Sequence, residues 1–136
     1  MNQTSTRSLK KSERICRQKQ IDMLFGGGKS ASMTAFPLRV VFLKQDKTEG
    51  QKTIQMMVSV PKRHLKHAVD RNRVKRQVRE AFRLNKNILS PLAEELAEAN
   101  LSLAFIWMDK KLYDTKVVET IVKSLLSRVT EKLLQK

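Results

Sequence analysis

Residues 59–82, SVPKRHLKHAVDRNRVKRQVREAF, pass from an apolar stretch through a short basic segment into a long run with helical periodicity. Four apolar side chains in that run follow the i, i+4, i+7, i+8 spacing of an amphipathic helix, namely Val74, Val78, Ala81 and Phe82. Asp70 stands directly before the run and is a type of residue that caps helices. We therefore expect a helix from Arg71 to about Lys86 with one face packed on a core.

The opposite face of this predicted helix is basic. It presents Asn72 and five cations, namely Lys75, Arg76, Arg79, Arg83 and Lys86. At 1.5 Å rise per residue the face is about 20 Å long, enough to meet several phosphates, and an arginine fork can donate two hydrogen bonds to one phosphate. Glu80 is the only acidic residue within the predicted helix, so the i,i+4 ion pairs of a solvated helix are mostly missing. The pattern favours polyanion binding over a merely solvated charged face.

The charge of the chain is concentrated in the same region. The whole chain has 28 Lys+Arg against 13 Asp+Glu, a net charge of +15. Residues 62–86 have ten basic and two acidic side chains, residues 1–29 have seven and two, and residues 87–136 have seven of each. A surplus gathered in one short segment indicates a binding surface rather than general solubility. The C-terminal half is interpreted as scaffold.

Length and composition bound the class of protein. A chain of 136 residues that is 40% hydrophobic is one domain with a modest core. No apolar run is long enough to span a membrane, and the N-terminal MNQTSTRSLKK has no apolar signal core, so we expect a cytoplasmic location. The single cysteine, Cys16, excludes an internal disulfide and any multi-cysteine zinc site.

The rest of the sequence predicts an α+β fold. We expect a flexible basic tail over residues 1–12 and one domain over residues 13–136, beginning with a helix over residues 18–25 that ends at Gly26-Gly27-Gly28. Residues 38–43 and 54–60 are predicted strands, joined by a hairpin-type loop around Gly50 and paired antiparallel. The expected architecture is a single-domain α/β sandwich with helices packed over a small mixed sheet.

Three further elements are expected towards the C-terminus. Ser90-Pro91 is a favourable helix start and predicts a short acidic helix to Ala99. Residues 101–108, LSLAFIWM, are nearly continuously apolar and predict a buried strand. Asp114 is expected to cap a last helix whose buried stripe comprises Val117, Val118, Ile121, Val122, Leu125, Leu126, Val129 and Leu133.

The order of residues in the basic segment is a more specific indicator of function than its charge. Arg71-Asn72-Arg73-Val74-Lys75-Arg76, followed by Arg79-Glu80-Ala81-Phe82, resembles the RNR signature of the bacterial ribonuclease P protein family. The resemblance extends upstream through Ser59-Val60-Pro61-Lys62-Arg63 and includes Arg14-Ile15, Ile21, Leu24-Phe25 and Gly28 near the N-terminus. In all it covers about residues 9–130.

The resemblance implies a partner RNA that does the chemistry. In that family a large catalytic RNA removes the 5′ leader of precursor tRNA with bound Mg²⁺, and the protein assists in what we expect to be a 1:1 assembly. The chain would then be the non-catalytic subunit of an endoribonuclease, with no catalytic residue and no metal of its own. Carried over by position, the residues that bind the catalytic RNA are Lys62, Arg63, Arg71, Asn72, Arg73, Lys75, Arg76 and Arg79. Arg73 lies well off the centre of the polar face, where a carboxylate or a loop is an alternative partner.

The resemblance also implies a cleft between the first helix and the sheet, where the single-stranded leader lies. In this sequence the cleft would involve Ile21, Phe25, Phe42 and Met57, with Ile21 in place of the family's usual aromatic residue. Unpaired bases stack on such surfaces with little demand on base identity. A left-handed crossover around the RNR helix is implied as well, against the usual rule for βαβ units.

Two other classes of function stay open at this point. One is a structural RNA-binding protein of ribosomal type, with the same basic face and no processing role. The other is a protein ribonuclease, for which we find no convincing pair of carboxylates or nucleophile with a base. His64 and His67 form an H-x-x-H that could ligate a metal, but Lys62, Arg63 and Lys66 repel cations there, so contacts to phosphate are favoured.

Overall fold

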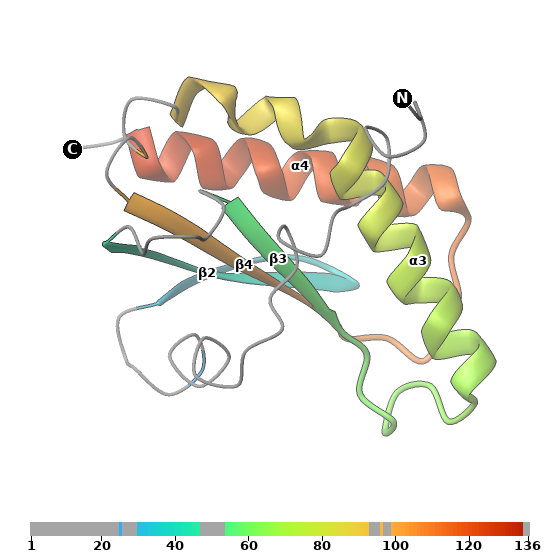
Figure 1. Cartoon of the computed structure of the whole chain (residues 1–136). Coiled ribbons are helices and arrows are strands. Elements are labelled where there is room, and N and C mark those ends of the chain that lie inside the picture. The colour runs from blue at the N-terminus through green and yellow to red at the C-terminus, as the bar shows by residue number, and fades with distance from the viewer. Residues whose placement is uncertain (1–24, 26–29, 47–53, 93–95, 97–98, 135–136) are drawn as a thin grey trace, which may run out of the picture.

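The described part of the chain is a layer of helices packed on one face of a mixed sheet (Figure 1). The computed structural model describes residue 25 and residues 30–46, 54–92, 96 and 99–134. The elements in order are β1 (Ala31–Ala35), β2 (Leu38–Asp46), β3 (Ile54–Ser59), α3 (Ala68–Asn85), the 3-10 helix η2 (Lys86–Leu92), β4 (Ala99–Trp107) and α4 (Thr115–Leu134). The predicted α+β fold is confirmed.

The sheet has the strand order β1-β2-β4-β3. β2 is antiparallel to β1 and to β4, whereas β3 is parallel to β4. The predicted antiparallel pairing of residues 38–43 with residues 54–60 is therefore wrong, because β4 lies between them. β4 is buried along almost its whole length, and a strand that is apolar on both faces is most stable in the middle of a sheet.

The connection between the parallel strands β3 and β4 runs through α3 and η2. Parallel neighbours cannot be joined by a tight turn, so a crossover with a helix is required. This requirement places α3 directly after the basic loop and against β3. The left-handed sense that the resemblance implies for this crossover stays a prediction.

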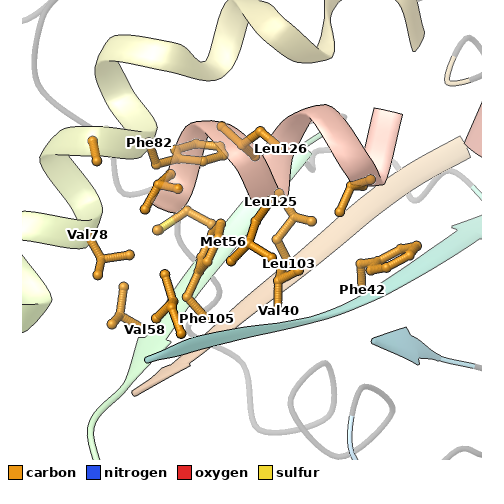
Figure 2. Packing of buried hydrophobic residues seen from close by; sticks show 14 of the residues in the cluster. Val40, Phe42, Met56, Val58, Val78, Phe82, Leu103, Phe105, Leu125 and Leu126 are labelled. Atoms are coloured by element: carbon orange, nitrogen blue, oxygen red, sulfur yellow. The ribbon is translucent and has the colours of Figure 1, made fainter. Parts of the chain in front are cut away.

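The core lies between the sheet and the two long helices. Figure 2 shows side chains of β2, β3 and β4, among them Met56 and Leu103, meeting Val78 and Phe82 of α3 and Leu125 of α4. The predicted apolar stripe of α3 is confirmed, since all four of its residues are buried: Val74, Val78, Ala81 and Phe82. In α4 the buried stripe is narrower than predicted, because Val117 is exposed.

The helix boundaries differ from the prediction at two places. α3 begins at Ala68 after His67, so Asp70 is not the cap but lies in the first turn, where its carboxylate faces the positive end of the helix dipole. Ser90 and Pro91 do not start a helix, because they lie inside η2, which continues directly from α3. α4 begins after Asp114 as predicted, and the Asp114 carbonyl accepts the Val118 amide at 3.1 Å.

The sequence did not predict β1, whose residues ASMTA have only a weak alternating pattern. β1 forms a hairpin with β2 through the two-residue turn Phe36-Pro37. The predicted tail over residues 1–12, the predicted helix over residues 18–25 apart from Phe25, and the loop around Gly50 lie outside the described residues.

Candidate nucleic-acid interface

The basic loop between β3 and α3 is a tight turn that leaves its cations exposed. The amides of His64 and Leu65 donate to the Pro61 carbonyl at 3.1 and 3.3 Å, and the Leu65 side chain is buried in the core. Lys62 and Arg63, both predicted to bind RNA, are exposed on this turn. The buried leucine anchors the loop, so the two cations project from a fixed backbone.

Arg71 fastens this loop to α3. Its Nη1 atom donates to the carbonyl oxygen of Leu65 at 2.9 Å and to that of Lys66 at 2.7 Å. The pairing with a loop that was considered for Arg73 is therefore made by Arg71. Although Arg71 belongs to the predicted RNA-binding set, part of its guanidinium is engaged within the protein.

The remaining predicted residues of α3 occupy its outer face. Asn72, Arg73 and Arg76 are exposed, and Lys75 and Arg79 are half-buried. Over its 18 residues the helix is about 27 Å long. The structure thus brings the predicted cations together along one helix and the loop that precedes it.

A hollow of about 530 Å³ lies between α3 and the start of α4. Arg73 and Arg76 both line it. The other lining residues are Val69, Gln77, Glu80 and Thr115.

Gln77 positions the wall of this hollow and was not singled out in the sequence. Its side chain is 7% exposed, and its Nε2 donates to the Tyr113 carbonyl at 3.0 Å and to Thr115 Oγ1 at 3.2 Å. The available signal in the sequence was the position of this polar residue, directly before Val78 and beside the predicted apolar stripe. These bonds hold the first turn of α4 against the basic face of α3.

One cation of α3 is neutralised within the helix. Arg83 pairs with Glu80 one turn earlier, with Nε donating to Glu80 Oε2 at 3.0 Å. The hydrogen bond from Arg83 lowers the pKa of Glu80, so the carboxylate is ionised at neutral pH. Arg83 therefore presents less uncompensated charge to a polyanion than its place in the sequence indicates.

The predicted leader cleft is divided between the two faces of the sheet. Phe42 lies opposite Leu103, and Met57 lies opposite Ala104. Since neighbouring residues of a strand point to opposite faces, Phe42 and Met57 cannot line one cleft. Phe42 is 3% exposed and packed in the core beside α4 (Figure 2). Its placement in the cleft was wrong, because the period of β2 directs it to the helices.

Met57 lies on the face of the sheet away from α3 and α4, which we call the distal face. Its neighbours there are apolar, namely Val41, Leu43, Ala104 and Ile106. The same face has the exposed Arg39, whose Nη2 donates to Ser32 Oγ at 3.2 Å. Of the other two predicted cleft residues, Phe25 is exposed and Ile21 lies outside the described residues.

The pair His64 and His67 lies at the start of the basic interface. His67 is the residue before α3 and is exposed, and His64 is half-buried in the turn. Within the described residues, no three side chains of His, Cys, Asp or Glu gather in a way that could hold a metal ion. Among the helices described, none is long and apolar enough to cross a membrane.

Comparison with known proteins connects this arrangement to one family. The family model described as Ribonuclease P matches residues 9–129 of the chain. The chain is 37% identical over 129 residues to the ribonuclease P protein component of Porphyromonas gingivalis, covering 95% of this chain and 91% of the relative. It is 35% identical over 88 residues to the one from Chlorobium phaeobacteroides, covering 65% and 60%.

Solved structures of RNase P proteins from two other bacteria have the same fold as this chain. The RNase P protein from Thermotoga maritima superposes with a TM-score of 0.65 at 23% identity, covering 85% of this chain and 96% of that one. A mutant of the Staphylococcus aureus RNase P protein gives 0.68 at 18% identity, with coverages of 95% and 98%. At these identities the likeness concerns the fold.

Proposed function

This chain belongs to the ribonuclease P protein family, and from that membership we propose that it assists an RNA-catalysed removal of the 5′ leader from precursor tRNA. As a member it is the protein component of an endoribonuclease holoenzyme. In our proposal the RNA subunit performs the cleavage, and this chain binds both that RNA and the substrate.

The basic face of α3 and its preceding loop are the proposed contact with the catalytic RNA. The observation that supports this most strongly is the alignment of Lys62, Arg63, Arg73 and Arg76, all exposed, along one loop and one helix. Exposed guanidinium groups suit phosphates because their planar forks donate two hydrogen bonds at once. Neutralising several phosphates releases counterions, so we expect this binding to weaken steeply with salt.

The distal face of the sheet is the proposed contact with the leader. Met57 and Ile106 are half-buried there and offer apolar surface to unpaired bases, while Arg39 is exposed for a phosphate. Stacking on apolar side chains tolerates any base. Such a surface suits a subunit that must accept many different leaders.

The Mg²⁺ that the resemblance implies is assigned to the RNA. The exposed lysines and arginines of the described interface do not ligate cations and repel them. These groups instead replace part of the ionic screening between two large RNAs. The protein should therefore lower the Mg²⁺ concentration at which the holoenzyme works. In this proposal the assembly is 1:1 and cytoplasmic.

The decisive experiment measures cleavage of precursor tRNA at low Mg²⁺ in three mixtures: catalytic RNA alone, protein alone, and both together. We expect a mature 5′ end only from the combined mixture. A second combined mixture containing Arg73→Ala and Arg76→Ala should need more protein for half-maximal activity, because two phosphate contacts are lost.

The same three mixtures separate the rival functions. Cleavage by the protein alone would place the active site in this chain and overturn the proposal. RNA binding without any gain in cleavage would indicate a structural RNA-binding protein of ribosomal type. A normal mature 5′ end that forms equally well without the protein would also contradict an assisting role.

A further inference from the structure

The turn between β1 and β2 presents the most exposed aromatic side chain of the protein. Phe36 is 62% exposed, whereas four other aromatic residues are fully or almost fully buried: Phe42, Phe82, Phe105 and Trp107. An exposed phenylalanine loses the stability that burial of its ring would contribute, so its position calls for a physical reason.

The backbone around Phe36 is held on both sides. Ala35 pairs with Leu38 across the turn, and Leu38 is fully buried. The Pro37 carbonyl accepts the Met108 amide at 2.8 Å, which ties the turn to the end of β4. The ring therefore projects from an ordered turn, so binding a ligand costs little conformational entropy there.

Exposed cations lie next to this turn along the chain that follows Met108. Lys110 and Lys111 are both exposed. The Asp109 carboxylate is directed to other partners: Oδ1 accepts the amides of Lys110 and Lys111 at 2.7 and 3.4 Å, and Oδ2 accepts the Tyr113 hydroxyl. The hydrogen bond from Tyr113 is the main reason that the pKa of Asp109 is lowered. The charge of Lys111 contributes to the lowered pKa of Asp109, but neither lysine forms a salt bridge with Asp109 in this described loop, and both side chains are exposed.

The turn is also continuous with the distal face of the sheet. Arg39 lies on that face and pairs with Thr34, one position from the Ala35–Leu38 pair that closes the turn. Phe36 is thus three residues before Arg39 in the chain, and the residue after it, Pro37, is bonded to Met108, two residues before Lys110. An aromatic ring flanked by cations is the combination with which proteins bind single-stranded nucleic acid.

We propose that Phe36 is a stacking platform for an unpaired base of the 5′ leader, with Lys110 and Lys111 on the adjacent phosphates. The occupant is the leader because it is single-stranded along its length, and because the platform continues the distal face past Arg39. The inference rests on the proposed function and extends the leader site beyond the sheet to its edge.

The test uses the assembled holoenzyme and precursor tRNAs with unstructured leaders of one to ten nucleotides. Phe36→Ala should weaken precursor affinity about fivefold to tenfold for long leaders and leave the shortest leader and mature tRNA unchanged. Phe36→Trp should restore or increase the affinity because indole stacks at least as well. Leu134→Ala is the matched control, since Leu134 is also an exposed apolar residue but is the last residue of α4 and not part of the turn.

A photoreactive phenylalanine analogue at position 36 identifies the RNA that is contacted. Crosslinks to leader nucleotides would support the inference, and crosslinks to the catalytic RNA alone would overturn it. An equal loss of affinity at every leader length would overturn it too, as would no loss at any length. If the wild-type protein gave no gain in cleavage, the proposed function would fail together with this inference. If the wild-type protein were active and the Phe36→Ala variant bound precursor tRNA with unchanged affinity, this inference alone would be refuted.

Discussion

Arg71 and Arg73 are separated by one residue on α3 and have different partners. The Arg71 guanidinium donates to two carbonyl oxygens of the loop before the helix, whereas Arg73 is exposed beside the hollow. In the sequence both belong to the same basic motif. Only the folded loop shows that one of them has a structural role.

This difference predicts opposite results for two alanine variants. Arg71→Ala should lower the free energy of unfolding by about 1 kcal/mol, because two carbonyls lose a charged donor, which corresponds to a fall in Tm of a few degrees. Arg73→Ala should leave Tm unchanged and reduce the salt dependence of catalytic-RNA binding by about one phosphate contact. Thermal unfolding and salt-dependent binding assays measure these effects. An unchanged Tm for Arg71→Ala would contradict the structural role of Arg71. An unchanged salt dependence of RNA binding for Arg73→Ala would contradict the proposed phosphate contact of Arg73.

At the scale of the element, α3 is a cationic helix in which Arg83 forms an ion pair with Glu80. Glu80 neutralises Arg83 and also lines the hollow beside Arg73 and Arg76. Its carboxylate has a lowered pKa and is charged at neutral pH. It therefore opposes the binding of phosphates at the centre of the proposed interface.

Removal of this charge should strengthen the binding of RNA. Glu80→Gln is expected to raise the affinity for catalytic RNA at low salt and to steepen the slope of log K against log salt by about 0.7–0.9, as Arg83 becomes available. Glu131→Gln, which removes an exposed carboxylate near the end of α4, is the control and should not change the slope. Equal slopes for the two variants would show that Arg83 does not reach RNA.

At the scale of the whole molecule, the sheet separates two functions. One face packs against α3 and α4 and provides most of the core. The other face contains Met57, Ile106 and Arg39 and is the proposed leader surface. A one-residue step along a strand moves a side chain from one role to the other.

Variants on the two faces should separate stability from leader recognition. Phe42→Ala should destabilise the protein by about 3–5 kcal/mol because it opens a cavity in the core. Met57→Ala should cost about 1 kcal/mol or less, since Met57 is half-buried, and should reduce the preference for precursor over mature tRNA. Urea unfolding and binding to the two RNAs measure both properties. The milder Phe42→Leu variant should stay folded and keep the preference for precursor over mature tRNA. If this variant lost that preference, Phe42 would be shown to contact the leader.

Much of the fold could be predicted because its signals are local. The periodicity of Val74, Val78, Ala81 and Phe82 predicts α3 and its buried face, and the apolar run after Asn100 predicts β4. The capping role of Asp70 and the helix start at Ser90-Pro91 were wrong, because α3 begins earlier and continues into η2. β1 was missed because four of its five residues are small or polar and have little pattern of their own. Its stability comes from pairing with β2.

The sequence alone determined the basic helix and the family, and it indicated the polyanion partner that we propose, because these depend on residue types at fixed spacing along one element. The tertiary structure decided the position of β4 between β2 and β3, since strand order depends on which apolar strand the helices can cover. It also decided that Phe42 is core and Met57 is not, and that Arg71 holds a loop while Arg73 faces the hollow. Those distinctions depend on contacts between segments far apart in the chain, and residue spacing within one element does not contain them.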